Sequence, residues 1–212
     1  EYMDIQGWGD QGYSRGVHVK GAGDYSTVRS CIIHENDTGA ANGNVGISID
    51  GENGNDASYI KLYNNVIYAV TGYGISARYY CAGAEIYNNT IYGCDVFGIR
   101  MSTYLSVWNN ISVDNGENYN NENVQSSGYN ITSTDPALTT NFTGDIWNYS
   151  ASDLFEDAAA GDFRLKTGSP AINAGVGTPY SSDVTGGERS DGFRDVGAFE
   201  ADGTNEAIAL IR

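Results

Sequence analysis

Four short stretches of the chain share one pattern, in which a glycine is followed by an apolar, a polar and an apolar residue. These stretches are Gly16-Val17-His18-Val19, Gly46-Ile47-Ser48-Ile49, Gly74-Ile75-Ser76-Ala77 and Gly98-Ile99-Arg100-Met101. Alternate side chains of an extended chain point to opposite faces, so the polar residues share one face. With the glycines aligned, that face carries two polar columns: His18, Ser48, Ser76 and Arg100 in the first, and Lys20, Asp50, Arg78 and Ser102 in the second.

The residue types in these columns suit one kind of chemistry. A cation that neutralises a uronate carboxylate, together with a base that removes the C5 proton, would cleave an acidic polysaccharide by elimination. Lys20 and Arg78 flank Asp50, and His18 is an alternative base, so these four residues are the candidate catalytic group. A ladder of compensating surface charges explains the same pattern, because opposite charges on neighbouring strands stabilise modestly. We favour the second interpretation.

A second repeat supplies aromatic residues. Its copies are Ile60-Lys61-Leu62-Tyr63-Asn64-Asn65-Val66-Ile67, Ala84-Glu85-Ile86-Tyr87-Asn88-Asn89-Thr90-Ile91 and Leu105-Ser106-Val107-Trp108-Asn109-Asn110-Ile111, with a fainter copy at Val28-Arg29-Ser30-Cys31-Ile32-Ile33. The outward rings and the cation of the faint copy form the candidate carbohydrate-binding group: Tyr63, Tyr87, Trp108 and Arg29. Such rings can stack on sugars or can simply pack against one another across strands.

The spacing of these repeats indicates how the strands are arranged. Asn65, Asn89 and Asn110 are 24 and 21 residues apart, and no helical segment lies between them. A parallel pair joined by a helix needs a crossover of a dozen or more residues, so the chain is expected to coil, with each strand pairing one turn later. The coil places Ile60, Ala84 and Leu105 inside and aligns the three asparagines as an inward amide ladder, with Cys31 at the same level in the earlier coil.

These coils resemble the pectate-lyase-like β-helix superfamily. The segment Gly168-Ser169-Pro170-Ala171-Ile172-Asn173-Ala174-Gly175, followed by Asp195-Val196-Gly197-Ala198-Phe199-Glu200, is similar to the closing segment of exported β-helix proteins. The resemblance implies an all-β, right-handed parallel β-helix (solenoid) of roughly five to six coils. We expect coils over residues 1–132 and an irregular C-terminal capping segment over 133–212, packed on the same solenoid and folding over its last coil. Residues 114–127, rich in Asn and Gly, are expected to form a loop.

Composition narrows the classes of partner. The net charge of −16 disfavours nucleic acid and anionic membranes, and no apolar run is long enough for membrane insertion. No cofactor is expected. Calcium at Asp50–Asp56 is a weak alternative, because the positions of its oxygen ligands fit poorly. The thiols of Cys31, Cys81 and Cys94 do not suit a zinc site, although Cys81 and Cys94 could pair. Candidate glycosylation sequons occur at Asn36, Asn88, Asn110, Asn130, Asn141 and Asn148.

Two functions follow from these features. The favoured one is a secreted, extracellular or cell-surface module with a structural, adhesive or glycan-binding role, whose open solenoid end would let copies stack into a fibre. Its partners would be other copies of the chain or a polysaccharide. The alternative is a polysaccharide lyase or glycoside hydrolase acting on acidic polysaccharide. A rod of about 25 Å is short for a catalytic cleft, so a non-catalytic role is preferred; if the chain is an enzyme, a lyase is expected.

Overall fold

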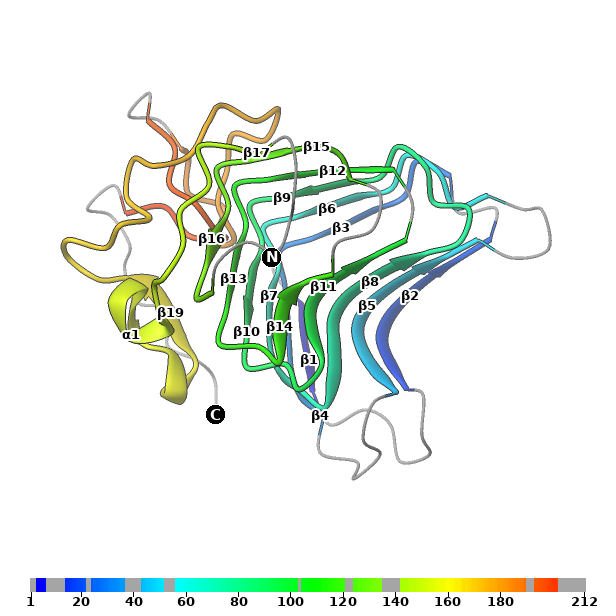
Figure 1. Cartoon of the computed structure of the whole chain (residues 1–212), viewed down its shortest axis with the longest axis horizontal. Helices are drawn as coiled ribbons and strands as arrows, with labels where there is room; N and C mark the ends of the chain where they lie inside the picture. Colours follow the sequence, from blue (N-terminus) through cyan, green and yellow to red (C-terminus); the bar gives the residue numbers. More distant parts are fainter. Residues whose placement is uncertain are drawn as a thin grey trace.

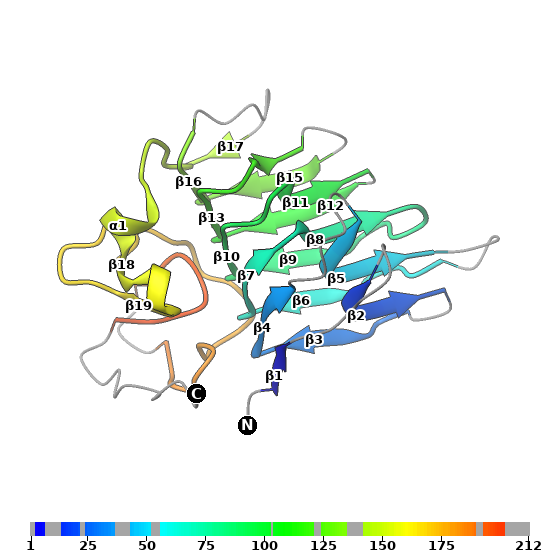
Figure 2. The same cartoon turned by 90° about the horizontal axis from the view of Figure 1, so that it is seen from below.

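The computed structural model describes residues 3–6, 14–21, 24–36, 43–51, 56–102, 104–120, 124–134, 142–189 and 193–201. Within these residues the chain contains almost no helix, and all of its strands except one short antiparallel pair form three parallel sheets that run along one coil (Figures 1 and 2). Each turn of the coil contributes one short strand to each sheet. The architecture is therefore a parallel β-helix, which confirms the expected fold class.

The three sheets are named here A, B and C. Sheet A contains β1 (Met3–Gln6), β4 (Cys31–Asn36), β7 (Val66–Val70), β10 (Thr90–Tyr92), β13 (Ile111–Val113) and β16 (Ile131–Thr132). Sheet B contains β2 (Arg15–Lys20), β5 (Asn44–Asp50), β8 (Gly72–Arg78), β11 (Phe97–Met101) and β14 (Glu117–Tyr119). Sheet C contains β3 (Thr27–Arg29), β6 (Lys61–Tyr63), β9 (Glu85–Tyr87), β12 (Leu105–Trp108), β15 (Val124–Gly128) and β17 (Phe142–Thr143).

The solenoid is slightly shorter than expected. It makes about four turns rather than five to six. Sheet B contains five strands, and each of the four steps from one strand to the next along the chain is one turn of the coil. The expected loop over residues 114–127 is also wrong in part. Its Asn-rich sequence contains β14 and the start of β15, which pair with β11 and β12 in the turn before.

The core follows the predicted columns. Ile60, Ala84 and Leu105 are fully buried, and so is the column that contains Leu62 and Ile86. Leu62 pairs in register with Ile86, one turn later. Burying an aliphatic side chain of this size stabilises the fold by about 1.5–3 kcal/mol. Because each strand is short, the stacking of turns, rather than any single turn, closes the core.

The amide ladder is present and is longer than predicted. The side-chain oxygen of Asn89 accepts from the backbone N–H of Asn65 at 3.0 Å and from its Nδ2 at 2.9 Å. The same arrangement joins Asn89 to Asn110 and Asn110 to Asn130. The ladder begins where the N–H of Cys31 donates to Asn65, as expected, and it ends on the carboxylate of Asp145.

The first asparagine of each corner pair has a different task. Asn64, Asn88 and Asn109 adopt left-handed backbone angles, with φ of 55°, 52° and 55°, which Asn tolerates better than most residues. Their side chains donate to Ser182, Thr178 and Val176 of the C-terminal segment. One residue of each pair thus holds the turns together, while the other holds the C-terminal segment.

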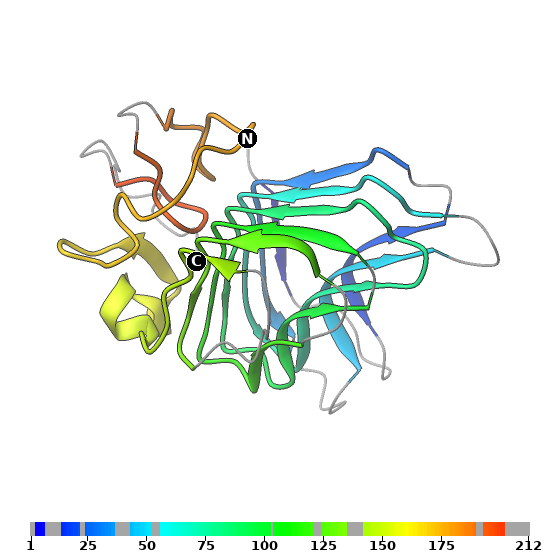
Figure 3. The ribbon, with the colours of Figure 1, turned by 45° about the horizontal axis from the view of Figure 1, so that its top comes forward.

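The expected position of the C-terminal segment is right only in part. Residues 142–146 do stack on the last turn, through β17 and the pairing of Ile146 with Ile131. From residue 151 onwards the segment lies along the flank of the solenoid instead (Figures 1 and 3). It contains α1 (Ala151–Leu154), β18 (Phe155–Asp157), a short 3₁₀ helix (Ala158–Ala160) and β19 (Asp162–Leu165). The reason is an apolar outer face on sheet A, where Ile32, Val66 and Ile111 pack against residues of this segment such as Phe163 and Val196. Within this segment, Arg189 and Glu200 form a buried ion pair whose charged atoms are 2.5 Å apart.

Candidate functional site

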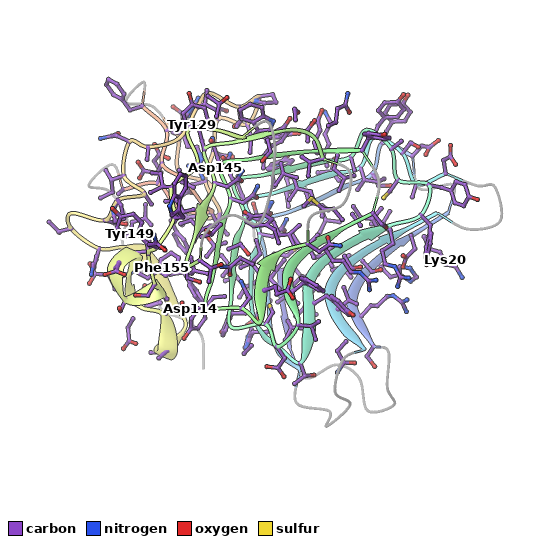
Figure 4. All side chains as sticks on the ribbon, viewed as in Figure 1. Lys20, Asp114, Tyr129, Asp145, Tyr149 and Phe155 are labelled. Carbon is purple, nitrogen blue, oxygen red and sulfur yellow. The ribbon has the colours of Figure 1, made fainter. Side chains whose placement is uncertain are left out.

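The two polar columns predicted on the outer face of sheet B are aligned as expected. His18 pairs with Ser48 and Ser48 with Ser76, while Lys20 pairs with Asp50 and Asp50 with Arg78. Arg100 continues the first column by pairing with Ser76. Figure 4 labels Lys20 at the opposite side of the molecule from Tyr149 and Phe155 of the C-terminal segment. The described part of this segment therefore does not cover the outer face of sheet B.

A cavity of about 220 Å³ lies on this face, and we call it the arginine cleft. It is lined by Arg15, Gly43, Val45, Ser48, Asp50, Tyr73, Ser76, Arg78 and Arg100. Among the described residues that line the cleft, three are arginines and one, Asp50, carries a carboxylate, in a chain whose net charge is −16. The cleft is a local region of positive charge on a strongly acidic protein.

Small side chains lie between the cations. Ser48 and Ser76 are only 2% and 3% exposed although they point away from the core. The Ser48 hydroxyl donates to Asp50 at 2.6 Å. The guanidinium of Arg100 lies 5.0 Å from the ring centroid of Tyr73, and that ring stacks on Phe97. The side chains of Ser48 and Arg100 therefore have fixed partners, which limits the conformational entropy they would lose on binding a ligand.

The carboxylate of Asp50 lies close to two basic side chains. Its carboxylate lies 3.6 Å from the guanidinium of Arg15 and 3.3 Å from Nε2 of His18. Burial, followed by the charge of Arg15, lowers the pKa of His18 below its ordinary value. The imidazole is consequently neutral at pH 7 and is able to accept a proton. The structure thus brings the four candidate catalytic residues, Lys20, Asp50, Arg78 and His18, to one face; their catalytic role stays a prediction.

Arg15 and Tyr73 line the cleft but were not among the predicted site residues. Strict alternation, counted backwards through the glycine, would place them inside the coil. The glycines break this alternation, because a Cβ on Gly46 would lie 2.6 Å from Cγ2 of Ile67, and one on Gly74 would lie 2.5 Å from Cγ2 of Ile91. A side chain at the glycine position would therefore point into the core. Because neighbouring side chains in a strand point to opposite faces, the residue before the glycine points outward.

The aromatic column is also in register, but the chain itself covers part of it. Arg29 pairs with Tyr63, Tyr63 with Tyr87 and Tyr87 with Trp108. Tyr180 of the C-terminal segment stacks on Tyr63 with ring centroids 3.8 Å apart. The hydroxyl of Tyr180 donates to the carboxylate of Glu85 at 2.9 Å. What stays open is a cavity of about 250 Å³ between Tyr87, Trp108 and residues 176–179. The carbohydrate-binding role of this column stays a prediction.

The predicted modification sites differ in accessibility. Asn88, Asn110 and Asn130 are at most 1% exposed, and their side-chain amides donate hydrogen bonds within the fold. A glycan on any of these three is incompatible with the packing. Asn148 is exposed. The side chain of Asn36 and the whole of Asn141 lie outside the described residues.

Cysteine and metal chemistry find little support in the described part of the chain. Cys31, Cys81 and Cys94 are buried and form no disulfide, so the possible pairing of Cys81 with Cys94 is not present. Burial raises the pKa of Cys94 to about 12. No group of three or more His, Cys, Asp or Glu side chains is placed to hold a metal among the described residues. Residues 52–55 of the weak calcium candidate lie outside them, so that candidate stays untested.

Two comparisons with known proteins find no match: no family model fits the sequence, and no curated protein resembles it. Among solved structures, the crystal structure of pectate lyase Pel9A is similar, with a TM-score of 0.57 and 17% sequence identity. The match covers 94% of this chain and 65% of that one, so this chain spans less than two thirds of the length of Pel9A. No described helix has the length and apolar character needed to cross a membrane. The chain has the fold of a pectate-lyase-like parallel β-helix.

Proposed function

We propose that this chain is a β-helix module that binds an acidic polysaccharide in the arginine cleft. The observation that carries the proposal is the convergence of Arg15, Arg78 and Arg100 on one cavity whose described lining residues include a single carboxylate. Guanidinium groups pair with carboxylates through two parallel hydrogen bonds, so a uronate is a matching ligand. The name of Pel9A, a pectate lyase, agrees with this class of polymer.

The cleft suits a sugar acid better than a compact anion such as phosphate. Its floor is formed by Ser48 and Ser76, whose hydroxyls can bond to sugar hydroxyls, and Tyr73 adds an aromatic wall. The guanidiniums come from three different strands, β2, β8 and β11. Neighbouring strands are about 4.8 Å apart, so the cations extend over a length that a sugar chain, rather than a single ion, would fill.

Elimination chemistry is the second candidate, and His18 is the observation that favours it. Its neutral ring, held 3.3 Å from Asp50, is a base beside the arginines. In such a reaction an arginine neutralises the uronate carboxylate and the imidazole takes the C5 proton. The electron pair of the C5–H bond then forms the C4–C5 double bond as the bond from C4 to the glycosidic oxygen breaks, and that oxygen leaves with a proton from solvent. Asp50 would orient the ring and stabilise its charged form.

Binding is tested by calorimetry with polygalacturonate at low ionic strength. We expect wild type to bind this polymer and not the neutral polymer galactan. Arg78→Ala and Arg100→Ala should each weaken binding about tenfold, since charge-assisted hydrogen bonds contribute about 1.5–3 kcal/mol. Lys61→Ala, which removes one positive charge from sheet C, is the matched control and should bind as wild type does. Equal losses in all three variants would contradict a localised site.

Turnover is tested separately, by following the absorbance of the unsaturated product. Activity that is lost in His18→Ala while binding persists would establish the lyase, and binding without any product would leave a binding module. An exported location, an adhesive role and end-to-end assembly into a fibre stay predictions. Electron microscopy of the purified chain tests the last of these, because isolated monomers would contradict assembly.

A further inference from the structure

Five tyrosines with more than half of their surface exposed gather where the chain passes from sheet B to sheet C. They are Tyr25 at 71%, Tyr59 at 53%, Tyr79 at 55%, Tyr80 at 56% and Tyr104 at 64%. Each follows a strand of sheet B and precedes the next strand of sheet C. We call this group the tyrosine edge. Exposed aromatic rings grouped in this way indicate a contact surface rather than a contribution to the core.

The backbone under this edge is strained. Tyr25, Tyr59, Tyr79 and Tyr80 have positive φ angles of 63°, 58°, 44° and 51°. A bulky residue in the left-handed region is unusual, because its Cβ crowds the backbone. Neither this conformation nor the exposure of the rings favours folding. Asn64, Asn88 and Asn109 adopt the same left-handed conformation at other corners, so the exposed rings, rather than the backbone, set the tyrosine corners apart.

Two of the rings stack on each other across neighbouring turns of the solenoid. The N–H of Tyr25 donates to Ser58, and the N–H of Tyr59 donates to Ala82, each at 3.1 Å, so successive corners are one turn apart. Tyr25 and Tyr59 stack with centroids 5.2 Å apart and planes 10° from parallel. The next turn has Gly83 at this place, and a Cβ there would lie 2.9 Å from the Tyr59 ring. The glycine therefore leaves room for the ring.

Arg78 joins the tyrosine edge to the arginine cleft. This residue lines the cleft, and its guanidinium lies 4.7 Å from the ring centroid of Tyr79. Its Nη2 also donates to the Tyr79 hydroxyl at 2.6 Å. The two surfaces are thus continuous, with cations on the face of sheet B and aromatic rings at the corner that follows it.

We propose that the tyrosine edge is a second subsite, which stacks against sugar rings of the same polysaccharide whose carboxylates occupy the arginine cleft. The inference rests on the proposed function. Tyr25 is 71% exposed and stacks on Tyr59 through one face of its ring, so a sugar would pack against the other face of Tyr25. Aromatic rings recognise the apolar faces of sugars, and the cations of the cleft recognise their carboxylates.

The experiment compares a short ligand with a long one. Calorimetry measures the affinity of galacturonate trisaccharide and of polygalacturonate for wild type, for the double variant Tyr25→Ala with Tyr59→Ala, and for the control Trp147→Ala. Trp147 is 44% exposed and lies on the C-terminal segment. The double variant should weaken binding of the polymer by about threefold to tenfold, from the usual strength of aromatic contacts, and leave the trisaccharide unchanged. The control should leave both unchanged.

The outcomes separate this inference from the proposed function. If wild type binds neither ligand, the proposed function fails. If wild type binds both and the double variant does so equally well, only the tyrosine subsite is overturned. If analytical ultracentrifugation shows that the wild type is a dimer and the double variant is a monomer, the edge is a contact between copies and the inference is wrong. Unchanged affinity for the trisaccharide shows that the alanine variant is folded, and Tyr25→Phe with Tyr59→Phe, which keeps both rings, should bind the polymer as wild type does.

Discussion

Asp145 ends the amide ladder with a carboxylate where another amide would continue it. It accepts from the backbone N–H of Asn130 at 2.7 Å and from its side chain at 3.2 Å, and Figure 4 labels it near Tyr129. Burial raises the pKa of Asp145 from the ordinary 3.8 to about 6. The folded chain therefore binds a proton more tightly than the unfolded chain, and this residue makes the fold less stable as pH rises from about 4 to about 6.

The substitution Asp145→Asn keeps an oxygen acceptor in the same position and removes the charge. Each pKa unit corresponds to about 1.36 kcal/mol, so the shift sets an upper limit of roughly 3 kcal/mol. Because Asp145 is only partly buried, solvent screening reduces this figure, and we expect the variant to be about 2 kcal/mol more stable than wild type at pH 8. At pH 4, where wild-type Asp145 is already neutral in the folded chain, the two proteins should be nearly equal in stability.

Urea unfolding at several pH values between 4 and 8, followed by tryptophan fluorescence, measures this difference. Asp95→Asn is the control, because Asp95 is exposed and its removal changes the net charge equally. A gain that is the same at every pH, or equal in the control, would mean that global charge rather than the ladder end is responsible. A less stable variant at pH 8 would refute the reasoning.

Four further outcomes test the packing and the thiols. Asn89→Ala should destabilise the fold by about 3–5 kcal/mol in urea unfolding, because the buried N–H of Asn65 and C=O of Leu62 in the turn before lose their partner. Asn88→Gly, which keeps the left-handed corner but loses the bond to Thr178, should cost only about 1 kcal/mol in the same assay. Tyr180→Ala should uncover Tyr63 and increase its reaction with a tyrosine-modifying reagent, measured by peptide mass analysis. Cys94 should resist alkylation at pH 8 until the chain is unfolded, because its pKa is about 12.

The regular part of the fold could be predicted from the sequence because its signals are local and repeated. Alternation fixes which residues point inward, and the Asn corner fixes the register, so the core and both outer columns follow. The ladder was underestimated, because its last two members lack the double asparagine. Asn130 and Asp145 are each followed by isoleucine, and that weaker signal marks the same corner.

The position of the C-terminal segment was predicted only in part, although the sequence contains a hint. Ile32-Ile33 and Val66-Ile67 are consecutive apolar residues, so these strands present apolar side chains on both faces. Ile33 and Ile67 face the interior, while Ile32 and Val66 require a cover from outside. Which segment supplies that cover depends on distant contacts such as Asn64 with Ser182, and alternation alone does not reveal them.

The composition of the cleft was predicted only in part, because its residues depend on a break in alternation. Asp50, Arg78 and Arg100 were found by counting forwards from the glycines. Arg15 and Tyr73 lie on the other side of those glycines, where the chain changes the direction of its side chains. A glycine inside a strand marks such a break, and this rule would have turned both residues outward.

The most direct test of the proposed function is a crystal structure of the chain with galacturonate trisaccharide bound. The account predicts a uronate carboxylate within hydrogen-bond distance of the guanidiniums of Arg78 and Arg100, above the hydroxyls of Ser48 and Ser76. A trisaccharide bound in any other place, with the arginine cleft filled only by water, would contradict it.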